Sequence, residues 1–269
     1  MNLVDLRIVA ESLPKTRKKY LTDSYAKEMM TDIVATFNER GKKYYLVSRE
    51  TIFHPLGGGQ PSDTGFILGE NFQFQVKKVL DVNGVLFHYG ILSKGELPQG
   101  NANAKLLLDW DKRYKIMRIH TAGHILDYAV NEVLGGEFET LSASHSAENA
   151  YVEYKIPPSL KLDLRSLEAK TNEVAKSCLQ VRVVFAESND IHEVLKNAPN
   201  LRRLPNLTEY RIVVIDKVNS IPCSGTHVAN TCEIGEIKVL KSNETPGGVA
   251  IYYDVKDLSN LNIKKGPAF

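Results

Sequence analysis

Two histidines stand four residues apart in the segment His120-Thr-Ala-Gly-His124. On an α-helix this spacing turns two side chains only about 40° from each other, so both imidazoles leave the same face. The aliphatic residues of the segment fall on the opposite side of the helical wheel: Ala122, Ile125, Leu126, Ala129 and Val133. The pattern therefore predicts a helix that buries one side and presents two nitrogen ligands on the other.

A second pair, Cys223 and His227, has the same spacing in a segment that contains Gly225. Three imidazoles and a thiolate suit zinc, which is bound by nitrogen and sulfur in a roughly tetrahedral arrangement. Either pair alone could be ordinary polar residues of a helix and a loop. Both pairs in a chain with seven histidines and three cysteines favour a metal site. The common metalloprotease signature is excluded, because it needs Glu directly after the first histidine and Thr121 stands there.

The predicted metal helix runs from about Asp111 to Leu134, where Gly135-Gly136 ends it. The segments before it are rich in β-branched and aromatic residues and predict strands at 20–25, 32–38, 43–48, 66–68, 72–82, 85–92 and 105–109, with a turn at Asn83-Gly84. The segments after it predict helices at 163–179 and 188–196, the second capped by Ser188, and strands at 150–156, 180–187, 208–216, 234–241 and 250–255.

The expected fold class is α+β, with a small N-terminal β-barrel followed by a domain whose helices lie on an antiparallel sheet. The best boundary is Pro98–Asn103, a segment without periodic apolar residues. It predicts one domain over residues 1–104 and a second, metal-containing domain over residues 105–269.

The composition limits the function classes. A net charge of +2 argues against a bulk electrostatic nucleic-acid binder, although local basic patches such as the one containing Arg113 and Arg118 could still grip an RNA end. No apolar run is long enough to span a membrane, and the N-terminus lacks a secretory pattern. Three cysteines fit a reducing cytoplasm better than a disulfide framework, so we expect Cys178 and Cys232 to be structural thiols.

The segment Gly57-Gly58-Gly59-Gln60-Pro61 predicts a loop. Its glycines could let the backbone approach a phosphate or an RNA backbone closely. They could equally form a plain turn in the barrel. It is not a Walker loop, because no Gly-Lys-Ser/Thr follows.

Taken in order, these segments resemble the AlaX family, the free-standing relatives of the alanyl-tRNA synthetase editing domain. The resemblance covers residues from about Tyr20 to Tyr252 and rests on several ordered segments: Asp23–Tyr25, Thr51–Phe53 with Gly57–Pro61, Asp109–Arg113, His120–His124, Leu201–Pro205, and Cys223–Val228 with Glu233–Gly235. The glycine-rich segment resembles that of the longer AlaX types. The resemblance leaves no segment for an ATP-binding aminoacylation domain, so we expect an editing domain with its barrel.

The resemblance implies deacylation of mischarged tRNA(Ala), with serine as the chief amino acid and glycine as a second candidate. It implies that Zn²⁺ is bound by His120, His124, Cys223 and His227. The candidate residues for contacting the tRNA substrate are Gly57, Gly58, Gly59, Gln60, Arg113 and Arg118.

Thr140, Ser142 and His145 follow the metal helix and could line the pocket. We take Thr140 and Ser142 as the candidate catalytic residues. Thr140 is the first candidate for a hydrogen bond to the serine hydroxyl, because a polar pocket rejects an analogue that lacks the hydroxyl. All three could also be ordinary polar residues of a strand and a turn.

The sequence departs from the family pattern at two places. Ser224 stands where the family often has glycine, and Pro246–Ala250 stands where the family usually has a basic Gly-Arg-Arg-like segment. Three alternatives stay open. The first is a non-catalytic tRNA- or protein-binding module with a structural zinc, since four protein ligands are typical of structural sites. The second is an editing domain of the threonyl type, against which the glycine-rich barrel argues. The third is a zinc hydrolase for a small molecule.

Overall fold

The computed structural model describes residues 5–201, 204 and 206–256. The chain forms two compact units, the first made of residues 1–117 and 224–226 and the second of residues 118–223 and 227–269. The long helix α2 (Trp110–Leu134) begins in the first unit and continues in the second. The domain boundary predicted after residue 104 falls inside β8 (Ala102–Leu108), a strand of the first unit.

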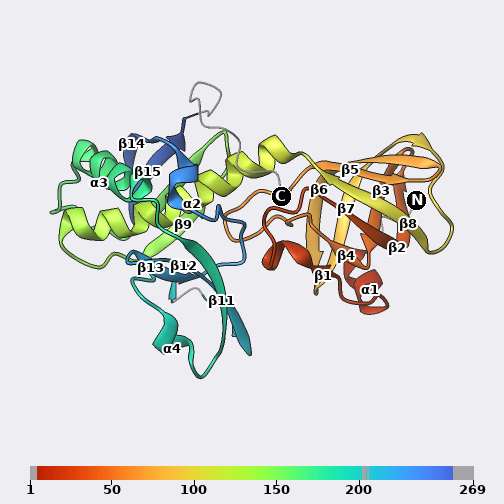
Figure 1. The fold of residues 1–269 in the computed structure, drawn as a ribbon, viewed down its shortest axis with the longest axis horizontal. Coiled ribbons are helices and arrows are strands. Elements are labelled where there is room, and N and C mark those ends of the chain that lie inside the picture. The colour runs from red at the N-terminus through yellow and green to blue at the C-terminus, as the bar shows by residue number, and fades with distance from the viewer. Residues whose placement is uncertain (1–4, 202–203, 205, 257–269) are drawn as a thin grey trace. The chain divides into compact units, whose positions relative to one another are not determined.

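The first unit contains a closed barrel of antiparallel strands (Figure 1). The order around the barrel is β2 (Glu28–Arg40), β3 (Lys43–Ser48), β7 (Val85–Gly95), β6 (Phe72–Val82), β5 (Gly65–Gly69) and β8. Closure pairs every strand on both sides and leaves no open sheet edge. The predicted small barrel is therefore confirmed.

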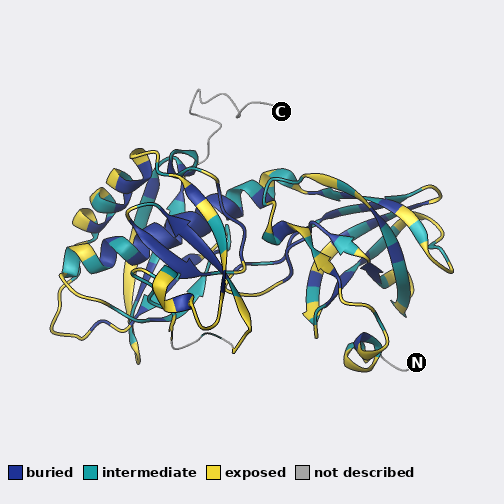
Figure 2. Ribbon diagram, turned by 60° about the horizontal axis from the view of Figure 1, so that its bottom comes forward, coloured by how far each residue is buried: buried dark blue, intermediate teal, exposed yellow. Residues whose placement is uncertain are grey.

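The hairpin of β6 and β7 follows directly from the sequence. Asn83 and Gly84 both have a positive φ, of 52° and 82°, which the favoured two-residue hairpin turn requires. Along β6, Phe72, Phe74 and Val76 are buried, whereas the glutamines between them are half-buried. This alternation sends every second side chain into the barrel core. Figure 2 shows the ribbon with buried residues in dark blue and half-buried residues in teal.

The remaining elements of the first unit are short: α1 (Leu6–Glu11), η1 (Lys19–Leu21), and the parallel pair β1 (Arg17–Lys18) and β4 (Glu50–Thr51). The strand predicted over residues 20–25 is wrong. Asp23 accepts hydrogen bonds from the backbone N–H groups of Tyr25 and Ala26, and this local turn competes with an extended strand.

The second unit contains two antiparallel sheets and helices, so the predicted α+β class is confirmed. One sheet has the order β14 (Ile237–Thr245), β15 (Gly248–Val255), β10 (Ala150–Tyr154) and β9 (Thr140–Ser144). The other has the order β11 (Val181–Glu187), β12 (Glu209–Ile215) and β13 (Asn219–Pro222). Its helical elements include α3 (Leu164–Lys176), α4 (Ile191–Val194) and η3 (Thr231–Ile234).

The fourth helix begins later than the sequence predicts. We expected a helix capped by Ser188, but α4 begins at Ile191, and its N-cap residue Asp190 makes no capping side-chain hydrogen bond. The N–H of Ser188 instead donates to the carbonyl of Thr208, which keeps Ser188 in extended pairing next to β11.

The helix α2 is buried more completely than an amphipathic pattern predicts, since every residue from Ile116 to Asp127 is buried. Its polar side chains consequently need partners inside the protein. Arg118 donates to the carbonyls of Ile234 and Lys256, and Asp127 accepts a hydrogen bond of 2.7 Å from the hydroxyl of Tyr154. Burial raises the pKa of Tyr154 well above its usual value, which keeps its hydroxyl protonated as the donor.

A buried ion pair stabilises the start of α2 in the first unit. Arg113 is 1% exposed and pairs with Asp63, which is 2% exposed. The same guanidinium group donates to the carbonyls of Ser24 and Ile52. Removing one partner of such a pair costs several kcal/mol, because the other charge is left buried without compensation.

Cys178 and Cys232 form a disulfide that joins the end of α3 to η3. Their Cα atoms are 4.7 Å apart, within the range that a disulfide requires. The expectation of two structural thiols is therefore wrong. The two residues are 54 positions apart in the chain, so their proximity depends on tertiary packing and has no local sequence signal.

We predict one titratable thiol per chain when the protein is unfolded with a chelator but without reductant, and three after reduction. The one thiol is that of Cys223, the cysteine outside the disulfide. Because the crosslink restricts the unfolded chain, Cys232→Ser should lower the free energy of unfolding by about 2–4 kcal/mol. Cys223→Ser is the control and should show no thiol before reduction. Three thiols in the unreduced protein would contradict the disulfide.

Candidate metal centre

Four potential metal ligands converge in the second unit. His120 and His124 lie on α2, Cys223 directly follows β13, and His227 lies in the loop after it. One ligand atom from each residue lies within 4.8 Å of the others. The four residues selected by their spacing in the sequence are thus brought together by the fold, as a group that could hold a metal ion.

Two distances in this cluster suit a tetrahedral ion. Cys223 Sγ lies 3.5 Å from His120 Nε2 and 3.3 Å from His227 Nε2. Metal–ligand bonds of about 2.0–2.3 Å at tetrahedral angles separate the ligand atoms by roughly 3.3–3.6 Å. These two sulfur–nitrogen distances therefore match the spacing of ligands around one ion.

The ring of His227 is held by a residue of the helix. Its Nδ1 lies 3.1 Å from the hydroxyl of Thr121, which also accepts a hydrogen bond from the N–H of Val228. A partner on the outer nitrogen of a histidine fixes the ring orientation of a metal ligand. Thr121, which occupies the position of the metalloprotease glutamate, therefore orients a ligand here.

His124 supplies the test of whether these residues fit a metal. Burial, followed by the neighbouring His145 and Arg211, lowers the pKa of His124 to about 3, so the imidazole is neutral at neutral pH. Neutral imidazole is the form that binds metals. Within the described part of the chain, its buried Nδ1 has no hydrogen-bond partner. A buried nitrogen without a partner costs about 1–3 kcal/mol. One ring nitrogen of His124 lies within 4.8 Å of the other three ligand atoms, where a neutral imidazole could bind a cation.

Two residues that the sequence analysis missed stabilise the backbone of the ligands. Asn219 donates a hydrogen bond of 2.7 Å to the carbonyl of His124, and Arg211 donates to the carbonyl of Cys223. The N–H of Cys223 in turn donates to the carbonyl of Arg211 at 3.0 Å. The available signal for Arg211 was a single charge directly before the buried β-branched run 212–215.

The three candidate pocket residues after α2 lie in different surroundings. His145 is buried, and its ring stacks on that of His120 with centroids 4.0 Å apart. Ser142 donates a hydrogen bond of 2.6 Å to Glu153, and this bond, with a second from Thr245, lowers the pKa of the Glu153 carboxyl. Thr140 begins β9, and its N–H donates to the carbonyl of Pro199. A strand advances about 3.3 Å per residue, so Thr140 lies roughly 16 Å along the chain from His145.

The glycine-rich segment forms the predicted loop. Gly57, Gly58 and Gly59 are exposed, whereas Gln60 is completely buried. The side chain of Gln60 makes two hydrogen bonds of 2.9 Å with Thr226, one to its hydroxyl and one from its N–H. Both residues belong to the first unit. The backbone of the three glycines is consequently accessible in this loop. The side-chain amide of Gln60 instead holds the loop against Thr226.

The two arginines of the predicted RNA-contacting set are buried. Arg113 and Arg118 are 1% and 3% exposed and bind Asp63 and backbone carbonyls, as described above. This geometry favours a structural role for both guanidinium groups. Pro246 and Gly247, from the segment without the family's arginines, form the turn between β14 and β15.

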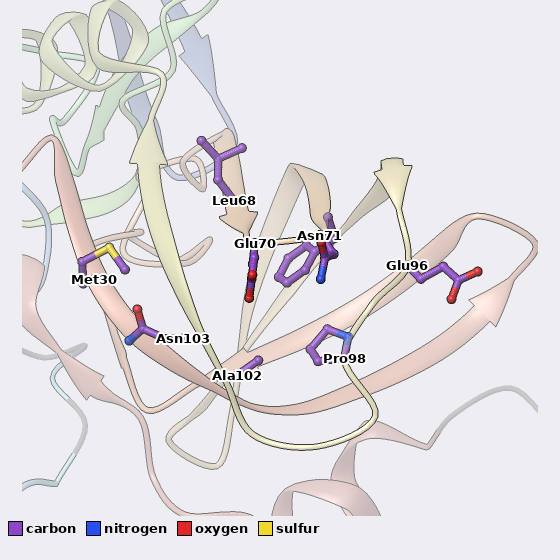
Figure 3. Close-up of a pocket in the computed structure, with 9 residues that line it drawn as sticks. Met30, Leu68, Glu70, Asn71, Glu96, Pro98, Ala102 and Asn103 are labelled. Carbon is purple, nitrogen blue, oxygen red and sulfur yellow. The ribbon is translucent and has the colours of Figure 1, made fainter.

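A separate cavity of about 550 Å³ lies in the barrel unit, lined by residues of the strands and their connections (Figure 3). Its lining residues include Glu70 and Glu96 but no lysine, arginine or histidine. Two carboxylates would repel phosphate, so this cavity does not suit a nucleic acid.

Among the described residues, none of the helices has the length and apolarity needed to cross a membrane.

Two family models match the chain. The model of class II (A) tRNA synthetases matches residues 9–112, and the model of the second additional domain of threonyl and alanyl tRNA synthetases matches residues 210–250. The second match contains Cys223 and His227.

Several relatives are similar over most of this chain. The alanyl-tRNA editing protein AlaX-M of Saccharolobus solfataricus is 33% identical over 252 residues, which are 90% of this chain and 99% of that protein. The alanyl-tRNA editing protein AlaX-L of Pyrococcus horikoshii is 34% identical over 225 residues, which are 82% of this chain and 53% of that protein. The alanine–tRNA ligase of Sulfurisphaera tokodaii is 29% identical over 91% of this chain and 26% of its own length. The chain thus spans about half of the AlaX-L protein and about a quarter of the ligase.

We predict that the purified protein binds one transition-metal ion per chain and that Cys223→Ala weakens this binding at least 100-fold. The loss of a ligand should exceed the roughly 10–100-fold effect of losing an outer partner. The measurement is metal analysis after dialysis, followed by titration against a chelating dye. His192→Ala, which removes an exposed histidine of α4, is the matched control. An unchanged metal content in Cys223→Ala would rule out this centre.

Proposed function

Because this chain belongs to the AlaX family of alanyl-tRNA editing proteins, we propose that it hydrolyses the ester bond between a wrong amino acid and the terminal ribose of tRNA(Ala). The proposed substrates are seryl-tRNA(Ala) first and glycyl-tRNA(Ala) second. The proposed resident metal is Zn²⁺.

The observation that carries this proposal is the convergence of His120, His124, Cys223 and His227 within 4.8 Å. A donor set of three imidazoles and one thiolate is softer than the oxygen sets that bind Mg²⁺ or Ca²⁺ and matches zinc. When bound, zinc supplies Lewis-acid polarisation of a carbonyl and acidification of a bound water.

The protein residues around the ligands have their own part in the proposal. Four protein ligands are typical of closed sites, so we assign the ligand set the task of joining α2 to the Cys223–His227 loop and thereby shaping the pocket. Thr121 and His145 contribute polar groups next to the ligands His227 and His120. An aminoacyl ester is intrinsically labile, so such a pocket needs to lower the barrier only moderately and to select its substrate well.

Selection of serine over alanine requires a group that hydrogen-bonds the serine hydroxyl. A site built around such a bond rejects an analogue without the hydroxyl by up to about 10⁴–10⁵-fold, whereas an apolar pocket discriminates poorly against one extra group. Thr140 remains the sequence-based prediction for this role, and Ser142 remains a sequence-based candidate catalytic residue. The polar side chains nearer the ligands support a polar pocket in general.

For the RNA part of the substrate, the exposed backbone of Gly57, Gly58 and Gly59 supports a contact with the sugar-phosphate chain. We leave Arg113 and Arg118 out of this proposal, because their guanidinium groups are buried against protein carbonyls and Asp63.

The closed ligand set favours one alternative, a non-catalytic tRNA- or protein-binding module in which the metal is purely structural. The lack of arginines in Pro246–Ala250 points the same way. A hydrolysis assay separates the two functions, because only the proposed enzyme turns over its substrate.

We predict that the purified protein deacylates seryl-tRNA(Ala) and spares alanyl-tRNA(Ala) by at least 100-fold, with glycyl-tRNA(Ala) assayed as the second proposed substrate. The measurement is the loss of labelled amino acid from each tRNA at equal enzyme concentration. Cys223→Ala should lose most of the activity, and His192→Ala should keep it. Binding of the tRNA without hydrolysis of any of the three esters would favour the binding module.

A second prediction tests the glycine loop. Gly57 has a backbone that other residues adopt, and a Cβ atom there would meet open space. Gly57→Leu should therefore fold with an unchanged melting temperature. If RNA approaches this loop, the KM for tRNA should rise about 10-fold with kcat retained. Gly100→Leu, at another open position of the first unit, is the control. Equal KM values in both variants would support a plain turn.

A further inference from the structure

The buried imidazole of His145 lies against a metal ligand although it belongs to neither ligand motif. Its ring is nearly parallel to that of His120, with an interplanar angle of 18° and centroids 4.0 Å apart. His145 is 5% exposed and directly follows β9. The stacked ring covers one face of His120 and restricts rotation of that ligand about its side-chain torsions.

A chain of hydrogen bonds holds His145 in this position. Its Nδ1 lies 2.8 Å from the hydroxyl oxygen of Tyr253, and that hydroxyl donates to the carbonyl of Ile119 at 3.2 Å. Because the tyrosine proton is used on Ile119, the tyrosine oxygen accepts from the Nδ1–H of His145. The chain therefore returns to the backbone of the residue directly before His120.

The environment keeps the tyrosine of this chain protonated. Burial, with the neighbouring charges of Asp127 and Asp254, raises the pKa of Tyr253 well above its usual value. A protonated hydroxyl is the form that donates to the carbonyl of Ile119.

Gly123 explains how this pair reaches the helix. A Cβ atom at this position would lie 2.7 Å from the hydroxyl of Tyr253 and 2.8 Å from Cε1 of His145. Glycine in a helix interior costs about 1 kcal/mol relative to alanine. Here the missing side chain leaves the space that Tyr253 and His145 occupy beside His120.

We propose that His145 and Tyr253 form a brace that fixes the imidazole of His120 in its metal-binding orientation, and that Gly123 admits this brace to the helix. The two residues are positioning residues, since they act through His120. The proposal depends on the metal centre and is independent of ester hydrolysis.

The experiment measures the affinity of the full chain for Zn²⁺ and Co²⁺ by competition with a chelating dye, together with the visible absorption of the Co²⁺ form. Tyr253→Phe removes one hydroxyl and keeps the ring. His145→Asn keeps a donor toward Tyr253 and removes the stacked ring. Both variants should bind the two metals about 10–100-fold more weakly, as is usual for outer partners of ligands, and should shift the Co²⁺ bands.

Gly123→Ala distinguishes the brace from a merely structural glycine. A glycine without a packing role would become a better helix former on substitution and would leave the metal affinity unchanged. The brace instead predicts weaker metal binding, because the added methyl group displaces His145 and Tyr253. Tyr252→Phe is the matched control, since the ring of Tyr252 contacts Tyr151 and Lys241.

Metal affinities and Co²⁺ spectra of Tyr253→Phe, His145→Asn and Gly123→Ala that match those of Tyr252→Phe would overturn the proposal. A wild-type protein that binds neither metal would overturn it as well, together with the zinc part of the proposed function. A protein that binds metal but hydrolyses no aminoacyl ester would overturn the proposed function alone.

Discussion

The burial of α2 is the constraint on which the centre of this protein depends. From Ile116 to Asp127 every residue is buried, so each polar side chain on that stretch must find a partner inside the protein. Arg118 donates hydrogen bonds to backbone carbonyls, and Asp127 accepts a hydrogen bond from the hydroxyl of Tyr154. His120 and His124 instead lie with Cys223 and His227, and one potential ligand atom from each of the four lies within 4.8 Å of the others. A bound metal ion would contact all four at once.

The polar residues of the molecule divide into those that expose a chemical group and those that hold backbone in place. Gln60, Arg113 and Arg211 all direct their hydrogen bonds to nearby protein atoms. Gln60 thereby positions a loop, Arg113 the start of α2, and Arg211 the backbone of Cys223. The proposed chemistry therefore depends on two other groups of residues. These are the ligand cluster with its neighbours and the exposed backbone of the glycine loop.

Local patterns in the sequence identified the features that depend on local physics. The barrel strands, the Asn83-Gly84 turn and the length of α2 follow from alternation, turn chemistry and spacing. Spacing also selected the four residues that the fold brings together as a group that could hold a metal ion. The features that the sequence analysis missed depend on contacts between residues far apart in the chain. Strand β13, Asn219–Pro222, contains polar residues and a proline with little intrinsic preference for a strand, and its pairing with β12 determines it. The stacking of His145 on His120, the contact of Arg211 with Cys223 and the pairing of Cys178 with Cys232 likewise depend on packing between segments far apart in the chain.

The disulfide has a topological consequence for the ligands. The covalent ring that it closes runs from Cys178 to Cys232 and contains β11, β12, β13 and two of the four ligands, Cys223 and His227. The other two ligands lie on α2, outside the ring. A single cut of the backbone anywhere inside the ring would leave both pieces covalently joined, and the two halves of the ligand set would stay within one molecule. The disulfide thus keeps the two halves of the ligand set in one molecule after such a cut, although neither of its cysteines belongs to the ligand set.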